Sequence, residues 1–417
     1  MNVSNIMLKI GKNGKDASQG LRRLSSNKKN ETLSLISETI SRNRDRIIEA
    51  NKTDVRFAHS KDLSESMIDR LLINDSRLDG IIKSIHQIID LPDPVGSIVE
   101  QFSRPNGLII KKVRTPIGTI GVIFESRPNV FVDAGALCLK SGNASILRCG
   151  SESFNTARVF EKCFISAFKQ SGISEFSTQL VPTRDRLAVE EMLKMNEFID
   201  VIVPRGGKGL VQLVQEKARV PIFAHLEGIV HIYVHEDADP LKAKEIIINS
   251  KTRRPGICGA VECLLIDKKF ISAHGTSLIS DLLLAGVSVK VSDELSNIEG
   301  TLLANNTDWG KEFLEMTIAV KVVDTVDQAV SHIELHGSNH TDCIITENDQ
   351  VSEQFFLELD SAIVMRNAST QFADGGEFGF GSEIGIATGK LHARGPVGLE
   401  QLTSFQYLVE GSGQTRK

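Results

Sequence analysis

TIGVIFESRPNVFVDAGALCLKSGNASILRC, residues 119–149, contains two apolar runs of strand length separated by a helical pattern. The runs are Thr119–Phe124 and Ala144–Cys149, and the helical pattern covers Val130–Lys140. A helix between two such runs indicates that they are parallel strands, because antiparallel neighbours can be joined by a short turn. This stretch therefore predicts a β-α-β unit and places the chain in the α/β class.

The same alternation continues along the chain. The next runs are TQLVP and DVIVP, with helical patterns over Glu152–Gln170 and Arg184–Lys194 and a helix opened by Gly206. A second series follows, with the runs GIVHIYV, AVECLLID, VSVKV, IAVKVVD, DCIIT and SAIVM. The two series predict two α/β domains, since a single hydrophobic core seldom grows beyond roughly 250–300 residues.

The residues before the first series predict helices and then a hairpin. Ala17–Leu91 has a helical pattern, which is clearest over Glu31–Asn51. LPDPVG (91–96) ends it, and two extended segments flank RPNG (104–107), where Asn-Gly is a strong hairpin signal. A lone hairpin cannot bury both of its faces within its own chain. We therefore expect this one to pair with the sheet edge of another subunit in a homo-oligomer.

Charge and hydropathy exclude several classes of partner. The chain has 48 basic and 53 acidic residues, a net charge of −5, and no basic stripe interleaved with aromatic residues, so we expect no nucleic acid partner. No apolar run is long enough to span a bilayer, and the chain begins without an apolar signal core. We therefore expect no membrane partner and a cytoplasmic location. The basic residues between Lys9 and Arg23 are compatible with an organelle transit peptide, but a solvated helix start explains them more simply.

The six cysteines predict neither a disulfide framework nor a metal site, because no C-x-x-C pair occurs. Those in apolar contexts typical of buried, inert thiols are Cys138, Cys149, Cys163, Cys263 and Cys343. Cys258 differs, because RRPGIC (253–258) forms a turn that presents its thiol on a loop. Arg253, Arg254 and Lys251 would favour the thiolate and attract an anionic substrate, so Cys258 is a candidate nucleophile. The alternative is an incidental loop cysteine.

Two further positions are candidates for binding an anion or an oxyanion. In VIVPRGGKGL (201–210) a strand ends and a helix begins after Gly206 and Gly207. Free backbone amides and the positive end of the helix would suit a dinucleotide phosphate there, and a simple tight turn is the alternative. Asn129 follows the strand in VIFESRPNVF (122–131), where it can cap the next helix or donate its amide to a developing oxyanion.

A glycine-rich segment, GGEFGFGSEIGIATGKLHARGPVGL (375–399), lies near the end of the chain. Its regularly placed apolar residues are unlike those of a flexible linker, so we expect a tight loop that lines a ligand. Lys390, His392 and Arg394 within it predict a bound anion.

Four strings carry a family resemblance: ESRPNVFVDAGALCLKSGNASILR, VPRGGKGL, RRPGICGAVE and KLHARGPVGLEQLTS. In this order they resemble the gamma-glutamyl phosphate reductase family of the aldehyde dehydrogenase superfamily. The resemblance implies a Rossmann-like cofactor domain, a smaller α/β catalytic domain, and an oligomerisation hairpin joined by the strand LTSFQYLV. The implied boundaries are 1–95 and 118–227 for the cofactor domain, 228–370 for the catalytic domain, 96–117 and 399–410 for the hairpin and tail strand, and 371–398 for a glycine-rich return segment.

The resemblance also assigns roles residue by residue. It places the catalytic nucleophile on Cys258 and the oxyanion-binding asparagine on Asn129. For the cofactor, it places the adenosine ribose contact on Arg148, the phosphate turn on Gly206–Gly207, and the nicotinamide ribose contact on Glu312. An arginine at position 148 is compatible with a 2′-phosphate, so NADPH/NADP+ is the expected cofactor.

The implied substrate contacts are basic. The residues expected to hold the phosphate or the α-carboxylate of the substrate are Arg253, Arg254, Lys390, His392 and Arg394. Hydrolytic members of the superfamily keep a glutamate that activates water, whereas His225 of HLEG stands at that place here. This difference suits a reductase that has to exclude water.

The implied reaction is the NADPH-dependent reduction of L-glutamyl 5-phosphate to L-glutamate 5-semialdehyde and phosphate, through a thioester on Cys258. It is the second step of proline biosynthesis from glutamate. A transient association with glutamate 5-kinase would protect the unstable acyl phosphate. Two alternatives remain: an enzyme of the same superfamily that acts on an acyl-CoA or a free aldehyde, and a non-catalytic protein that keeps the fold.

Overall fold

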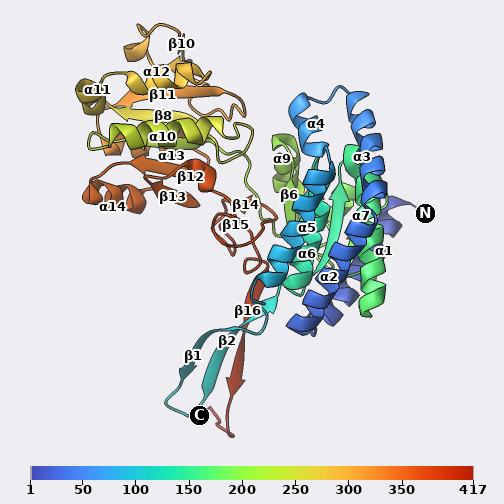
Figure 1. Ribbon diagram of the computed structural model, residues 1–417. Coiled ribbons are helices and arrows are strands. Elements are labelled where there is room, and N and C mark those ends of the chain that lie inside the picture. Colours follow the sequence, from blue (N-terminus) through green and yellow to red (C-terminus); the bar gives the residue numbers. More distant parts are fainter. Residues whose placement is uncertain (1, 417) are drawn as a thin grey trace. The chain divides into compact units, whose positions relative to one another are not determined.

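A computed structural model gives the fold and describes residues 2–416. The chain forms two compact units (Figure 1). Within the described residues, unit 1 comprises 2–224, 379–386 and 396–416, and unit 2 comprises His225–Phe378 and Ala387–Gly395. No helix in the described part of the chain is both long enough and apolar enough to cross a bilayer.

Unit 1 begins with a group of helices. They are α1 (Val3–Leu21), α2 (Ser26–Arg42), α3 (Arg44–His59), α4 (Glu65–Leu71) and α5 (Asp75–Asp90). The helical pattern over Glu31–Asn51 is confirmed, but it is divided between two helices, because α2 ends and α3 begins at Asn43. The side chain of Asn43 donates from Nδ2 to the carbonyl of Thr39 at 2.8 Å and so competes with the backbone for a helical acceptor.

The core of unit 1 is a parallel sheet of β3 (Thr119–Phe124), β4 (Ala144–Cys149), β5 (Thr178–Leu180) and β6 (Val201–Arg205). The connecting helices are α6 (Asn129–Lys140), α7 (Phe154–Ser171), α8 (Leu187–Leu193) and α9 (Lys208–Lys217). The β-α-β prediction is confirmed, and every residue of β3 and β4 is buried. The strand order is β5-β4-β3-β6, so successive strands are added on one side of β3 as far as β5 and then on its other side with β6. In such sheets the ligand crevice lies at the carboxyl ends of the strands beside that change of side.

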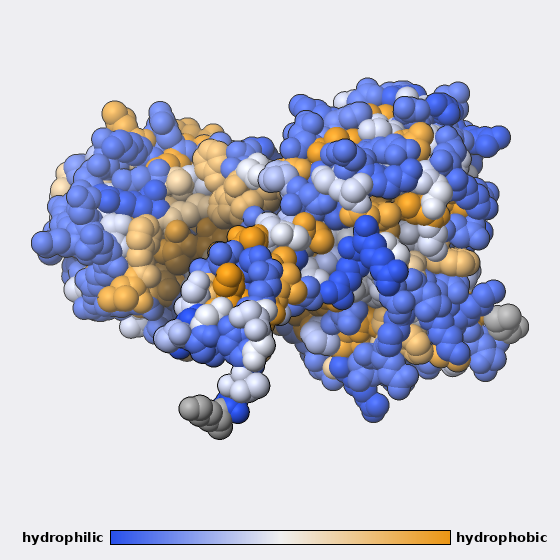
Figure 2. Space-filling view, turned by 90° about the horizontal axis from the view of Figure 1, so that it is seen from below, coloured by the Kyte–Doolittle hydropathy of each residue, from blue (hydrophilic) through white to orange (hydrophobic). Residues whose placement is uncertain are grey.

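The predicted hairpin is confirmed as a separate antiparallel sheet in unit 1. It consists of β1 (Ile98–Ser103), β2 (Ile109–Pro116) and β16 (Thr403–Glu410), in the order β1-β2-β16. Gly107 adopts φ 84° in the turn, a conformation that glycine reaches without strain. The antiparallel sheet extends away from the helices of unit 1 (Figure 1), and apolar side chains show among charged ones on the face seen in Figure 2.

Unit 2 contains a second parallel sheet, with strand order β10-β9-β11-β8-β7-β12-β13. Its strands are β7 (Val230–Val234), β8 (Val261–Asp267), β9 (Ser288–Val291), β10 (Leu302–Leu303), β11 (Thr317–Val323), β12 (Thr341–Ile345) and β13 (Ile363–Arg366). The runs predicted as strands are confirmed. The short edge strand β10 was not predicted, because two residues carry no periodicity.

Helices cover both faces of this sheet. They are α10 (Pro240–Thr252), α11 (Lys268–His274), α12 (Ser277–Leu284), α13 (Val326–His336) and α14 (Asp349–Glu358). Residues of α10, α11 and α12 share one buried apolar cluster, and residues of α13 and α14 share another. The short remaining elements are the 3₁₀ turns η1 (Ser151–Ser153), η2 (Asp293–Leu295) and η3 (Thr370–Phe372) and the strands β14 (Ile386–Ala387) and β15 (Gly395–Pro396).

Candidate active site

The amino ends of three neighbouring strands bring two histidines and a cysteine together in unit 2. His225 precedes β7, Cys258 precedes β8, and His340 immediately precedes β12. These strands are adjacent and parallel in the order β8-β7-β12, so the segments before them meet at one edge of the sheet. The donor atoms of the three side chains all lie within 4.8 Å of one another. The structure thus gives the predicted nucleophile two partners.

Hydrogen bonds hold the loop that carries Cys258 in place. Residues 255 and 256 form the predicted turn, and the Ala260 amide donates to the carbonyl of Ile257 at 3.0 Å. The buried side chain of Gln371 donates from Nε2 to the carbonyl of Ser250 at 2.9 Å and to that of Arg254 at 3.4 Å. The half-buried thiol therefore lies on a loop that hydrogen bonds hold in place.

Gly228 allows the segment of His225 to approach the nucleophile. A Cβ atom at this position would lie 2.2 Å from the carbonyl oxygen of Cys258 and 2.7 Å from its Cα atom. Only glycine fits so close to another backbone. The Gly228 amide donates to Oε1 of Glu312 at 2.8 Å, which places this predicted cofactor ligand beside the same loop.

Electrostatics select Cys258 among the cysteines. Burial raises the pKa of its thiol, but the charge of His340 and the hydrogen bond and charge of His225 outweigh burial and hold the pKa well below its usual value. By contrast, burial raises the pKa of Cys149, Cys163 and Cys343 to about 12. A lowered pKa favours the thiolate, and a thiol beside two imidazoles is typical of an activated cysteine nucleophile.

The expected role of Lys251 is wrong. Its ammonium group is fully buried and pairs with the buried carboxylate of Glu262 at 2.6 Å, so it is not available to attract an anion. Burial lowers the pKa of Lys251 and raises that of Glu262 to about 7. Glu262 also accepts from the Leu314 amide at 3.2 Å, so the pair joins α10, β8 and the segment that carries Glu312.

The basic residues expected to bind substrate fall into two groups. Arg253 and Arg254 are exposed on the Cys258 loop, where Arg253 Nη1 lies 3.5 Å from Gln371 Oε1. Lys390 and Arg394 both bind the carboxylate of Asp360, Arg394 Nη1 at 2.8 Å from Oδ1. These two cations lower the pKa of Asp360. A substrate anion at this second group would therefore compete with a carboxylate of the chain. His392 lies between Lys390 and Arg394 in the sequence, and its backbone φ is 65°.

Asn129 lies in unit 1 as the first residue of α6. The alternative of a helix cap is wrong, because Pro128 occupies the cap position and Asn129 donates from Nδ2 to Oδ2 of Asp133 at 3.0 Å. Asp133 also accepts from the Ser84 hydroxyl at 3.2 Å. The amide of Asn129 is thereby held in one orientation, and its second N–H hydrogen can serve another acceptor.

Three of the four residues expected to hold the cofactor lie in unit 1, with Arg148 near the carboxyl end of β4 and Gly206 and Gly207 directly after β6. The Gly207 amide donates to Oε2 of Glu125 at 3.1 Å, and a Cβ atom on Gly206 would lie 2.3 Å from the same oxygen. This turn therefore accepts a carboxylate at close range, as an anion-binding turn should. Arg148 is buried; its Nη2 donates to the carbonyl of Arg184 at 3.4 Å, and its Nε has no hydrogen-bond partner among residues 2–416. These features fit a phosphate-bearing dinucleotide.

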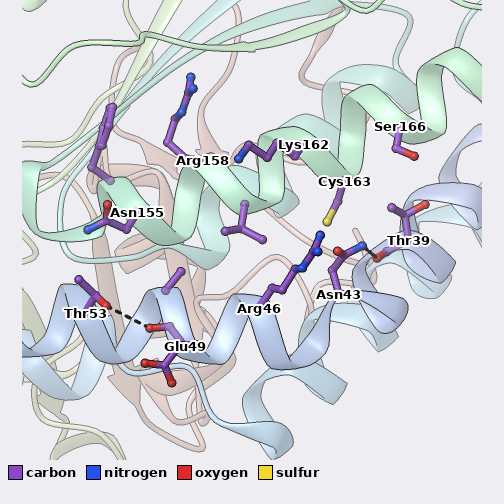
Figure 3. Close-up of a pocket in the computed structure, with 13 residues that line it drawn as sticks. Thr39, Asn43, Arg46, Glu49, Thr53, Asn155, Arg158, Lys162, Cys163 and Ser166 are labelled. Atoms are coloured by element: carbon purple, nitrogen blue, oxygen red, sulfur yellow. Dashed lines mark hydrogen bonds between the residues drawn. The ribbon is translucent and has the colours of Figure 1, made fainter.

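A groove on unit 1 lies between α3 and α7 and has a volume of ≈ 960 Å³ (Figure 3). Arg46, Arg158 and Lys162 are among its lining residues, and Arg158 pairs with Glu161 at 3.1 Å. Its lining includes none of the residues expected to bind cofactor or substrate.

Sequence reasoning missed His340 and noted His225 only for its place in HLEG. Both histidines lie in segments without regular structure just before strands, and neither belongs to a local motif. A sequence-level signal was available only for His225, through the family position that it occupies.

Comparison with known proteins connects this geometry to a family. Residues 7–295 match the model of the aldehyde dehydrogenase family. The chain is 50% identical over 416 residues to the gamma-glutamyl phosphate reductase of Beijerinckia indica subsp. indica, a match that covers 99% of this chain and 96% of that one. It is 51% identical over 413 residues to the enzyme of the same name from Rhizobium johnstonii, with 99% and 97% covered. The crystal structure of gamma-glutamyl phosphate reductase from Thermotoga maritima shares 41% identity and a TM-score of 0.96, with 99% and 100% covered.

Proposed function

The chain belongs to the aldehyde dehydrogenase family, and on this basis we propose that it reduces L-glutamyl 5-phosphate to L-glutamate 5-semialdehyde and phosphate with NADPH. It is an oxidoreductase that acts on an aldehyde or an acyl phosphate. The observation that carries the proposal is the cluster of Cys258 with His225 and His340, in a chain about half identical to reductases of that name.

Cys258 begins the proposed reaction as a thiolate. His340 and His225 lower its pKa, which favours the ionised sulfur without a separate base. The sulfur bonds to the γ-carbonyl carbon of the substrate, the bond from that carbon to the phosphate oxygen breaks, and inorganic phosphate leaves. The product is a thioester on Cys258.

Reduction releases the cysteine. When bound, the reduced nicotinamide supplies the hydride that converts the thioester to a thiohemiacetal oxyanion. The carbon–sulfur bond then breaks as the aldehyde carbonyl forms, and His340 and His225 stabilise the departing thiolate. His225 stands where hydrolytic relatives keep a glutamate, so this position offers no carboxylate to activate water against the thioester.

Asn129 is proposed to stabilise the oxyanion. Its link to Asp133 at 3.0 Å supports this role, because a fixed amide loses little orientational freedom when it meets the developing charge. The role requires that the second N–H of this amide reach the carbonyl oxygen of the substrate bound at Cys258, together with the Cys258 backbone amide.

NADPH is proposed to bind through the residues assigned by the family resemblance. Gly206 and Gly207 would hold the diphosphate, where Glu125 now accepts from the Gly207 amide. Arg148, whose buried Nε meets no hydrogen-bond partner within residues 2–416, would hold the adenosine ribose and its 2′-phosphate. Glu312 would bind the nicotinamide ribose, and its contact with Gly228 supports a place beside Cys258.

Arg253 and Arg254 are the stronger candidates for the substrate anions. They are exposed on the same loop as the nucleophile, whereas Lys390 and Arg394 already bind Asp360. His392 remains proposed as part of the second group. The cytoplasmic location and the association with glutamate 5-kinase stay predictions.

The antiparallel sheet is proposed to join subunits of a homo-oligomer. Its strands β1 and β16 expose Ile98, Val99, Phe405, Tyr407, Leu408 and Val409. Exposed apolar side chains on a sheet that has open edges are typical of a strand-pairing interface.

Steady-state oxidation of glutamate 5-semialdehyde tests the proposed substrate. The purified chain would be assayed for NADP+ reduction with inorganic phosphate, with coenzyme A, or with neither. We expect turnover only with phosphate or arsenate, because phosphate has to attack the thioester in the reverse direction. Turnover that requires coenzyme A, or that needs no acceptor other than water, would overturn the proposal.

A further inference from the structure

The cluster of His225, Cys258 and His340 has the donor set of a metal site as well as that of a nucleophile. We propose that these three side chains bind one Zn²⁺ ion, which reversibly blocks Cys258. The proposal shares the Cys258 cluster with the proposed function, but it concerns a ligand that the reaction does not use.

The donors select a soft or borderline cation. One thiolate sulfur and two imidazole nitrogens match the ligands that Zn²⁺ takes in proteins, whereas Mg²⁺ and Ca²⁺ prefer oxygen ligands. Three protein ligands also leave the fourth tetrahedral position open for water.

The geometry needs little change to close around an ion. The donor atoms lie within 4.8 Å of one another. Bonds of ~2.0–2.3 Å would place tetrahedral ligands roughly 3.3–3.7 Å apart, so the donors have to approach by about 1 Å. The imidazole rings already lie with their centroids 5.0 Å apart at an angle of 70°. Small rotations of the three side chains can supply this movement.

His340 is oriented for coordination. Its Nδ1 lies 2.9 Å from the hydroxyl of Thr341, and its buried Nε2 has no hydrogen-bond partner within the described part of the chain. A metal-ligating histidine commonly uses one ring nitrogen for the ion and fixes the other by a hydrogen bond. Glu312, held by the Gly228 amide at 2.8 Å, places a carboxyl group close to the site.

A second cluster in unit 2 has the same composition and provides a control. Cys263 Sγ lies 3.7 Å from His332 Nε2, and His231 completes the group. All three are buried, and the ammonium of Lys321 lies 3.4 Å from His332 Nδ1. A cation beside one ligand and the lack of solvent contact both oppose metal entry. We therefore assign the zinc site to Cys258 and not to Cys263.

Equilibrium binding of zinc to the metal-free, full-length chain tests the assignment. Zn²⁺ would be titrated against a chromophoric chelator for wild type, Cys258→Ser, His340→Gln, His225→Asn and the control Cys263→Ser. We expect one tight equivalent for wild type and Cys263→Ser, and affinity at least about 100-fold weaker when a ligand is removed. Circular dichroism would check folding. If His340→Gln does not fold, the half-buried His225 and Cys258 variants decide the result.

Loss of zinc from Cys263→Ser with retention by Cys258→Ser would overturn the assignment, as would equal affinity of wild type and Cys258→Ser. Alkylation of Cys258 by iodoacetamide gives a second readout. One equivalent of Zn²⁺ should slow it at least about tenfold, EDTA should restore the rate, and Mg²⁺ should have no effect. An unchanged rate would also contradict the site. A chain without reductase activity that still binds zinc through Cys258 would contradict the proposed function and leave the zinc site standing.

Discussion

The ionisation of Cys258 depends on side chains that lie far from it in the sequence. His225 and His340 belong to two other segments, yet their donor atoms lie within 4.8 Å of the sulfur. Arg253 and Arg254, on the same loop as the cysteine, are exposed to solvent. The nearby Lys251 forms an ion pair with Glu262. Two imidazoles therefore do what the sequence pattern assigned to three neighbouring cations.

Removal of one imidazole should make the thiol less acidic. In His340→Gln the thiol loses a neighbour that lowers its pKa, so the pKa of Cys258 should rise. Alkylation by iodoacetamide, followed by mass spectrometry across pH, should show its midpoint at higher pH. The kcat/KM at neutral pH should fall about 100-fold. His332→Gln, in the second cluster, is the matched control, and an unchanged midpoint for His340→Gln would contradict the electrostatic account.

Gly228 should tolerate no side chain. Gly228→Ala would place a Cβ atom 2.2 Å from the Cys258 carbonyl oxygen, so the loop has to move. A displacement of about 1 Å at a nucleophile can cost about 100-fold in rate, and we expect a loss of that size in kcat. Gly80→Ala, on α5, is the control, because a Cβ atom there would meet no atom within 4 Å, and it should keep full activity. Wild-type kcat for Gly228→Ala would show that the contact is not needed.

At the scale of elements, the buried Lys251–Glu262 pair joins α10 to β8 at 2.6 Å. Lys251→Met leaves the carboxylate buried without its partner, which should lower the free energy of unfolding by about 3–5 kcal/mol. Urea denaturation would measure this loss. Adding Glu262→Gln should recover much of it, because glutamine is uncharged and still accepts from the Leu314 amide. A double variant no more stable than Lys251→Met would contradict this explanation.

The elements themselves could largely be predicted, and the site only in part. Apolar runs such as Thr119–Phe124 are buried on both faces, which gives parallel strands a strong sequence signal. The break at Asn43 was missed, because it depends on one side-chain hydrogen bond inside a continuous helical pattern. His340 was missed because its partnership with Cys258 depends on the strand order β8-β7-β12, which no local pattern encodes. The cluster also lies at the amino ends of strands, whereas the general rule for open α/β sheets directs attention to the carboxyl ends.

At the scale of the whole molecule, the antiparallel sheet has more apolar surface than one chain covers. Val409 is 57% exposed on β16 and Ile98 is 54% exposed on β1. A charge at such a position should oppose subunit pairing, so Val409→Glu should shift the oligomer toward monomer in sedimentation velocity. Leu241→Glu, on α10 at a position 74% exposed, is the control and should leave assembly unchanged. A wild-type chain that sediments as a monomer would refute the proposed interface.

The thioester on Cys258 can be observed directly in a single turnover. Without phosphate, glutamate 5-semialdehyde and NADP+ should give a burst of about one NADPH per chain, after which the acylated cysteine blocks further reaction. Addition of phosphate should restart turnover, and mass spectrometry should locate the acyl group on Cys258. Cys263→Ser should keep the burst and Cys258→Ala should lose it. A burst that survives in Cys258→Ala, or an acyl group on another residue, would contradict the covalent mechanism.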